Sequence, residues 1–257
     1  MSYFGPEFIA FFEGLAKDNS KAYFDRHRKT YTTHVKEPFD ELVADMILRM
    51  QEFDPKLAIQ PKDAIFRINR DIRFSKDKTP YKTFVGAHIA RGGRKDHSRP
   101  GLYFHLSHED IMVGSGVYMV DREALHRIRS HIAGNPDEFA RLLEDPGFKG
   151  RYGTIRGDAN KRVPKEFQGA YEVQPLIANK QFYYRAKMGP DAIVSDQLTD
   201  VLMDHYSAAM GMNGFLTDAL EGSYPLSAHL LLGSPDVPDE ALGVIDGHHV
   251  VLAIPHG

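Results

Sequence analysis

Positive charge is concentrated in one short stretch of this sequence, together with side chains that could bind an anion. Residues 67–83 read RINRDIRFSKDKTPYKT and hold six Lys or Arg and two Asp. Arginine guanidinium groups donate paired hydrogen bonds to a phosphate or a carboxylate, and lysine adds a compact charge. The stretch therefore predicts a strand and loop, over residues 67–83, that bind or turn over a small anionic ligand bearing a phosphate or carboxylate.

The order of residues within this stretch predicts which side chains would meet the ligand. Alternate side chains of a strand share one face, roughly 6.6–6.8 Å apart. Arg67 and Arg73 would therefore bracket Asn69 and Asp71 on one face, and the following loop would close over the ligand. The expected ligand-binding residues are Arg67, Arg70, Arg73, Ser75, Lys76, Lys78, Tyr81 and Lys82.

Two nearby side chains are candidates for proton transfer, and would be the catalytic residues if the chain is an enzyme. His88 lies on the next predicted strand and is the first candidate for a general base, because histidine titrates near neutral pH. Asp71 is the second candidate. The chain shows no GxSxG, P-loop or helix-opening GxGxxG motif, so the sequence alone names no reaction.

Arg70 differs from its neighbours because strand alternation places it on the apolar face. A buried, unpaired guanidinium is costly, so Arg70 requires a carboxylate or carbonyl partner. Glu13, Asp25 or Glu41, on predicted N-terminal helices, are the expected partners. The alternative is that Arg70 marks a pocket that interrupts the core.

The charge distribution leaves two other functions open. Residues 67–99 hold ten Lys or Arg and three Asp, whereas the whole chain has a net charge of −3, so the remainder carries −10. One alternative is a nucleic-acid-binding module that uses the basic segment 67–99, with Tyr81, Phe84 or Tyr103 exposed for stacking. The other is a structural or interaction domain whose charges pair internally, although exposed pairs contribute only ~0–1 kcal/mol each.

Composition narrows the class of protein. The chain has 257 residues, 42% of them hydrophobic, and no cysteine, which excludes disulfides and thiolate sites. It shows neither a signal peptide nor an apolar run near the roughly 20 residues of a membrane span. His105 and His108 with Glu109 or Asp110 match no metal-ligand spacing. We therefore expect a soluble, cytoplasmic protein without a membrane span, metal or cofactor, and its oligomeric state stays open.

Helices are predicted where apolar residues recur at a spacing of three and four. They cover residues 5–17, a stretch capped by Asn19 or Ser20 that Pro38 should end or kink, and a stretch from Phe39 to before Pro55. Further helices begin after Asp121, at Pro136, and at Ser195 or Asp196, the last running to about residue 220. Residues 148–180 are expected to be mostly loop.

Strands are predicted where the apolar period falls to two. They cover residues 64–74, 83–91, 102–107, 111–119 and 182–188. Short connections predict an α+β fold with an antiparallel meander sheet of about four to six strands, packed against N-terminal and C-terminal helices. We expect one domain over 1–222 and a C-terminal appendage over 223–257, in which 248–255 is a final strand.

Three stretches resemble a known family. RINRDIRFSKDKTPYKT at 67–83 resembles the signature of the domain of unknown function 2461 family of conserved hypothetical microbial and fungal proteins. NSKAYFDRHRKTY at 19–31 and GSGVYMVDREALHRIRSHI at 114–132 are similar to its N-terminal helix and to the segment after its strands. The resemblance covers roughly residues 5–220 and implies a compact α+β domain with no established activity or cofactor. Tyr23 stands where the family leads us to expect Trp, Asn69 where we expect an aromatic residue, and the loop at 164–167 departs from the family's Gly-containing form.

Overall fold

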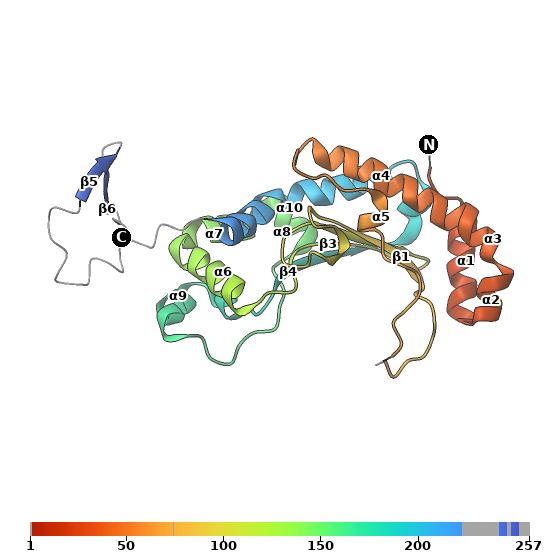
Figure 1. Cartoon of the computed structure of the whole chain (residues 1–257), viewed down its shortest axis with the longest axis horizontal. Helices are drawn as coiled ribbons and strands as arrows, with labels where there is room; N and C mark the ends of the chain where they lie inside the picture. Colours follow the sequence, from red (N-terminus) through yellow and green to blue (C-terminus); the bar gives the residue numbers. More distant parts are fainter. Residues whose placement is uncertain (1, 74, 223–241, 246–247, 252–257) are drawn as a thin grey trace, which may run out of the picture. The chain divides into compact units, whose positions relative to one another are not determined.

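The chain forms two compact units, Met1–Glu221 and Gly222–Gly257. The computed structural model describes residues 2–73, 75–222, 242–245 and 248–251. In the second unit, β5 (Leu242–Ile245) pairs antiparallel with β6 (His248–Val251). The first unit holds every candidate residue named above, and Figure 1 shows its elements.

The first unit has the predicted α+β architecture. Its sheet contains β1 (Phe84–Ile89), β2 (Leu102–Ser107), β3 (Ile111–Val117) and β4 (Phe182–Met188). The strands lie in the order β1-β2-β3-β4, and every neighbouring pair is antiparallel. The strands predicted at 102–107 and 182–188 have the observed bounds. The strand predicted at 83–91 is observed only over 84–89, and the one predicted at 111–119 ends at residue 117.

The N-terminal helices follow the predicted pattern with one change at Pro38. Ser20 caps a helix as expected, because its hydroxyl accepts a hydrogen bond from the Tyr23 amide. Pro38 does not end the helix. The chain instead passes through a π-helical turn just before it, which accommodates the missing proline N–H. The elements are α1 (Pro6–Lys17), α2 (Lys21–Arg26), α3 (Arg28–Tyr31), η1 (Thr32–Lys36), α4 (Glu37–Gln51) and α5 (Pro61–Ala64).

The helices after β3 include two that the sequence did not predict. The expected loop at 148–180 contains α8 (Pro146–Tyr152) and α9 (Gln168–Val173), so that prediction was wrong in part. Asp145 starts α8 by accepting a hydrogen bond from the Phe148 amide, and Phe148 and Tyr152 are buried four residues apart. The other elements are α6 (Arg122–Gly134), α7 (Pro136–Leu143), α10 (Leu198–Glu221), and the short turns η2 (Gly93–Lys95), η3 (Lys165–Phe167), η4 (Pro175–Ala178) and η5 (Pro190–Val194).

The two faces of the sheet differ in how they are covered. One face carries buried side chains such as Val85, Phe104 and Val113, and α4 and α10 lie over it (Figure 1). Most side chains of the opposite face are half-buried or exposed, including Tyr103 and Arg185. We call this second surface the open face. The core therefore lies between the sheet and its helices, on the side away from the open face.

The predicted strand at 64–74 is not a regular strand: Ala64 ends α5, and residues 65–73 together with the loop at 75–82 form an irregular segment that we call the arm. It makes isolated bridges, Ile65 with Ala87 and Asn69 with Tyr81, and the Arg70 amide donates to the Pro80 carbonyl at 2.9 Å. Pro80 has no N–H to return a second hydrogen bond, so a regular ladder cannot form there. The alternation of exposed and buried side chains nevertheless persists, since Arg67, Asn69, Asp71 and Arg73 are all exposed.

Candidate functional site on the open face of the sheet

Arg70 finds its partners within the arm rather than on the N-terminal helices. Its guanidinium donates to the carboxylate of Asp77 and to the hydroxyl of Thr79, and lies 3.5 Å from the Ser75 hydroxyl. The side chain is 26% exposed, so it is not fully buried either. The expectation of Glu13, Asp25 or Glu41 as its partner was wrong, because the polar loop folds back and supplies a closer carboxylate.

Asp71, Arg73 and Lys78 also contact the arm itself. Arg73 holds Asp71 through two hydrogen bonds of 2.7 and 3.0 Å, and these lower the pKa of the exposed Asp71 carboxyl to about 2. Lys78 donates to the Ile72 carbonyl at 2.8 Å. Asp71 is therefore a weak base outside the sheet. Within the described part of the chain, the side chains of Arg67, Lys76 and Lys95 make no hydrogen bond or ion pair.

Tyr81 is part of the core rather than a surface for stacking. It is 7% exposed, and its ring stacks on Phe24 with centroids 4.3 Å apart. Asn19 fixes its backbone through two hydrogen bonds of 3.0 and 3.1 Å. A ligand or a nucleic-acid base cannot reach this ring without unpacking the N-terminal helices.

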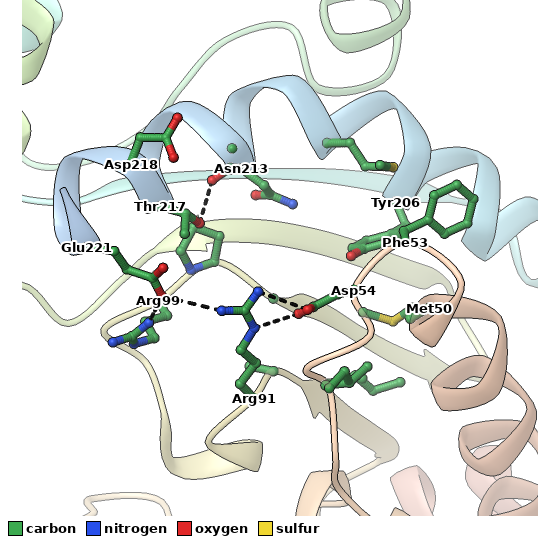
Figure 2. A pocket seen from close by; sticks show the side chains of 17 residues that line it. Met50, Phe53, Asp54, Arg91, Arg99, Tyr206, Asn213, Thr217, Asp218 and Glu221 are labelled. Atoms are coloured by element: carbon green, nitrogen blue, oxygen red, sulfur yellow. Dashed lines mark hydrogen bonds and ion pairs between the residues drawn. The ribbon is translucent and has the colours of Figure 1, made fainter.

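Two arginines of the basic segment 67–99 are paired with distant carboxylates. Arg91 holds Asp54 through hydrogen bonds of 2.7 and 2.9 Å, and Arg91 and Arg99 both reach Glu221 at the end of α10. Figure 2 shows these side chains around a small pocket. Its volume is about 230 Å³. These ion pairs join the β1–β2 loop to the segment after α4 and to the end of α10, so both arginines make structural contacts.

A second cavity lies on the open face and has a volume of about 350 Å³. Its centre is one row of residues in register across all four strands: His88 opposite Tyr103, Tyr103 opposite Gly114, and Gly114 opposite Arg185. Because neighbouring strands are ~4.8 Å apart, Gly114 leaves a gap between the tyrosine and the arginine. The cavity is lined by Phe66, His88, His97, Tyr103, Met112, Gly114, Ser115, Gly116, Tyr118, Tyr183, Tyr184 and Arg185.

Glycine forms the floor of this cavity for a structural reason. Gly116 has φ +96°, and a Cβ there would lie 2.2 Å from the Phe182 carbonyl oxygen. A Cβ at Gly114 would lie 3.0 Å from the Tyr184 carbonyl oxygen. The close approach of β3 to β4 therefore excludes side chains from the floor, and the space above it stays open.

His88, the candidate base, forms part of the cavity wall. It is 6% exposed, and its ring stacks on His97 with centroids 5.6 Å apart and planes 6° apart. Burial, with His97 beside it, lowers the pKa of His88 to about 4. Its Nδ1 atom is buried without a hydrogen-bond partner among the described residues. The ring is therefore neutral at pH 7 and carries an unused polar atom.

His97 reaches the cavity from the β1–β2 loop, and the backbone fixes its place. The amides of Tyr118 and Met119 donate to the His97 carbonyl at 3.3 and 3.0 Å. Tyr118, which also lines the cavity, is 61% exposed. One wall of the cavity is therefore assembled from a loop that is tied to the end of β3.

A hydrogen-bonded chain of three side chains reaches the cavity from the β2–β3 hairpin. The Tyr103 hydroxyl lies 3.0 Å from His105 Nδ1, and His105 Nε2 lies 3.3 Å from the Asp110 carboxylate. The hairpin turn brings Asp110 back toward the strand, since the Ser107 hydroxyl donates to its carboxylate at 2.9 Å. Lys187 also donates to Asp110.

The pKa values fix the direction of the hydrogen bonds in this chain. Burial pushes the pKa of Asp110 upward, but hydrogen bonds from Lys187 and Ser107 outweigh it and leave the pKa lowered. Burial lowers the pKa of His105 despite the charge of Asp110. A neutral imidazole that donates from Nε2 to a carboxylate must accept at Nδ1, so the Tyr103 hydroxyl donates to it. Burial raises the pKa of Tyr103 to about 12, with the charge of Asp110 adding to the shift.

The arm reaches this site through Phe66, with Lys82 beside it. The ammonium group of Lys82 lies 5.2 Å from the ring of Phe66, which lines the cavity, and 5.8 Å from the ring of Phe84. Phe84 in turn stacks on His105 at 4.4 Å. Of the site residues predicted from the sequence, His88 lines the cavity, and Lys82 lies beside Phe66, which also lines it. Asp71 and the other predicted ligand residues lie elsewhere along the arm.

Family comparison places the chain among its relatives. The model of the family described as "Conserved hypothetical protein (DUF2461)" matches residues 7–215. The chain belongs to the DUF2461 family. Nothing among the curated proteins or the solved structures matches it. The family description names no activity or ligand, so the geometry of the site has to supply the argument about function.

The DUF2461 match spans the whole four-stranded sheet and the cavity. Two further findings concern a membrane span and a metal site. In the described residues, no helix has the length and apolar character to cross a membrane. The same residues bring no three His, Cys, Asp or Glu side chains together as metal ligands. Tyr23, where the family resemblance leads us to expect Trp, is buried and donates to the Phe11 carbonyl at 3.1 Å.

Sequence reasoning missed Tyr103 as a partner of His105 and Asp110. The signal was present, because Tyr103 and His105 are two residues apart on one strand and therefore share a face. Asp110 directly precedes the next strand and follows two bend residues. Considering His105 and Asp110 only as metal ligands hid this pairing.

Proposed function

We propose that this DUF2461 protein binds a small anionic ligand with a flat ring on the open face of its sheet, between Tyr103 and Arg185. The cavity volume of about 350 Å³ lies within the range of ~300–1,000 Å³ that small-molecule sites occupy. The basic stretch 67–83 first suggested an anionic ligand of this class. We place the ligand at the row of residues that crosses the sheet from His88 to Arg185.

The unpartnered Nδ1 of His88 is the observation that carries the proposal. A buried polar atom without a hydrogen bond costs ~1–3 kcal/mol, and folded proteins rarely keep one without a use. His88 keeps one in the wall of a cavity. A ligand that rearranges this wall and hydrogen-bonds the ring would recover that cost.

Charge supports an anionic ligand. Arg185 is exposed at the cavity wall and makes no ion pair within the described residues. The cavity lining contains no Asp or Glu. An unpaired guanidinium beside aromatic rings suits a carboxylate or phosphate attached to a flat ring, because the ring can stack while the anion takes paired hydrogen bonds.

Binding of four simple ring compounds tests the proposal. Phenyl phosphate and benzoate carry the anion, and phenol and benzamide are their neutral counterparts. We expect the two anions to bind and to shift the NMR signals of His88 and Tyr103. Arg185→Gln should weaken their binding at least tenfold, which is about 1.4 kcal/mol.

The matched control is Arg141→Gln, which removes a 70% exposed arginine on α7 and should leave binding unchanged. Equal binding of the neutral and anionic compounds would contradict the proposal, as would full affinity in Arg185→Gln. NMR signal changes confined to Arg67 and Lys76 would show that the anions bind at the arm instead of the cavity.

A further inference from the structure

We infer that Tyr103 is the proton-transferring residue of the open-face cavity, with His105 and Asp110 as positioning residues that accept and stabilise its proton. The inference rests on the proposed function, because a reacting hydroxyl matters only if a ligand occupies the cavity. It adds a chemical role for the ligand: a compound that gives up a proton from oxygen, nitrogen or an activated carbon.

The geometry supports this order of proton movement. Tyr103 lines the cavity, its hydroxyl donates toward His105 Nδ1 at 3.0 Å, and His105 Nε2 faces the Asp110 carboxylate at 3.3 Å. As a substrate proton moves to the Tyr103 oxygen, the phenolic proton moves to Nδ1. The imidazolium that forms lies beside Asp110, so its charge is compensated.

The surroundings of this chain favour a fixed arrangement over a mobile one. Phe84 stacks on the His105 ring, and both oxygens of Asp110 accept hydrogen bonds, from Ser107 and Lys187. The Asp110 side chain is only 16% exposed. A base held in one orientation needs little reorganisation at the moment of proton transfer.

The raised pKa of Tyr103 makes its reactivity depend on His105. At a pKa of about 12, free phenolate at pH 7.5 is scarce, so Tyr103 can act as a nucleophile or base only while its proton is transferred. Tyr118 and Tyr183 line the same cavity and have no histidine acceptor among their described hydrogen bonds. They therefore serve as internal references.

Labelling of the full-length protein with benzenesulfonyl fluoride tests the inference without any ligand. The Tyr103 oxygen bonds to sulfur, fluoride leaves, and the phenolic proton passes to His105. Peptide mass spectrometry would give the labelling rate of each tyrosine at pH 7.5. We expect Tyr103 to react at least tenfold faster than Tyr118, although Tyr118 is 61% exposed.

Variants separate the chemical role from a structural one. His105→Gln should slow labelling of Tyr103 at least tenfold while Tyr118 and Tyr183 keep their rates, and Asp110→Asn should slow it severalfold. Tyr103 reacting no faster than Tyr118, or at an unchanged rate in His105→Gln, would overturn the inference. If His105→Gln alters the labelling rates of all three tyrosines, the fold of that variant has changed. The labelling rate of Tyr103 in Asp110→Asn then tests the inference. Because the probe is neutral, this result is independent of anion binding at Arg185.

Discussion

His88 shows, at the scale of a single residue, how the proposed binding site opposes folding stability. Strand alternation places its ring on the open face, where the β1–β2 loop covers it. The ring gains stacking on His97 but leaves Nδ1 without a partner among the described residues. A buried ring in this state resists protonation, because the charged form would lose its hydration.

We predict that His88 makes the protein less stable in mild acid. Its folded pKa of about 4 lies below the unfolded value of 6.5, so the unfolded state binds the proton more readily between these values. The stability that the protein has while His88 is neutral is fully present above pH 6.5 and is lost as the pH falls toward 4. Between pH 7 and pH 5 the loss from His88 is ~2 kcal/mol. Urea unfolding at both pH values would measure it.

The variant His88→Gln should lose that part of the pH dependence, whatever its stability at pH 7. His126→Gln changes a side chain that is 56% exposed and serves as the control, with the pH dependence of the parent. A pH dependence in His88→Gln equal to that of the parent would show that another buried histidine, such as His131 or His205, carries the effect.

Partners of single side chains were the hardest part of the site to predict. The sequence placed His88 on a strand near the site and Arg70 on the inner side of the arm. It did not reveal that Asp77 folds back onto Arg70, or that Asp110 folds back onto His105. Both pairings depend on the path of a turn, and charge and alternation say little about that path.

At the scale of elements, the prediction succeeded where a hydrophobic period matched a regular hydrogen-bond pattern. The strands at 102–107 and 182–188 and the helix at 5–17 have both, and their bounds were recovered to within a residue. Residues 65–73 of the arm have the hydrophobic period without the regular hydrogen-bond pattern, because their partner segment contains Pro80. In α8, the buried pair Phe148 and Tyr152 gave only a short helical signal, because residues 147–153 also contain three glycines and two charged residues.

Strand β3 gives a prediction at this scale, because its closeness to β4 requires glycine at position 116. Gly116→Ala forces a side chain into a left-handed backbone conformation, with its Cβ 2.2 Å from the Phe182 carbonyl oxygen. We expect a loss of about 2–3 kcal/mol or more in the free energy of unfolding. Chemical denaturation would measure the loss.

The control for this prediction is Gly150→Ala in α8, where no atom lies within 4 Å of the added Cβ. Alanine in a helix is favoured over glycine, so this variant should gain ~0.5–1 kcal/mol. Equal stability of Gly116→Ala and the parent would mean that β3 and β4 can separate at that point, and the glycine floor of the cavity would need another explanation.

At the scale of the whole molecule, the uneven charge of the sequence becomes more balanced in three dimensions. Four of the ten cations in 67–99, Arg70, Arg73, Arg91 and Arg99, contact carboxylates, and those of Arg91 and Arg99 lie outside that segment. Lys78, Lys82 and Arg94 donate to backbone carbonyls. A run of basic residues therefore indicated where the chain folds back on itself at least as much as where an anion binds.

The extent of the folding unit gives the last prediction. Within the described residues, both hydrophobic clusters consist of buried residues between Phe4 and Ala219, and the family match ends at residue 215. A chain ending at Gly222 should therefore unfold cooperatively within ~1 kcal/mol of the full chain and keep its binding of phenyl phosphate. Ending the chain at Gly214 removes the buried Phe215 and Leu216 and should cost about 3 kcal/mol or more. Denaturation of both fragments would check this, and an unfolded 1–222 fragment would show that residues 223–257 belong to the domain.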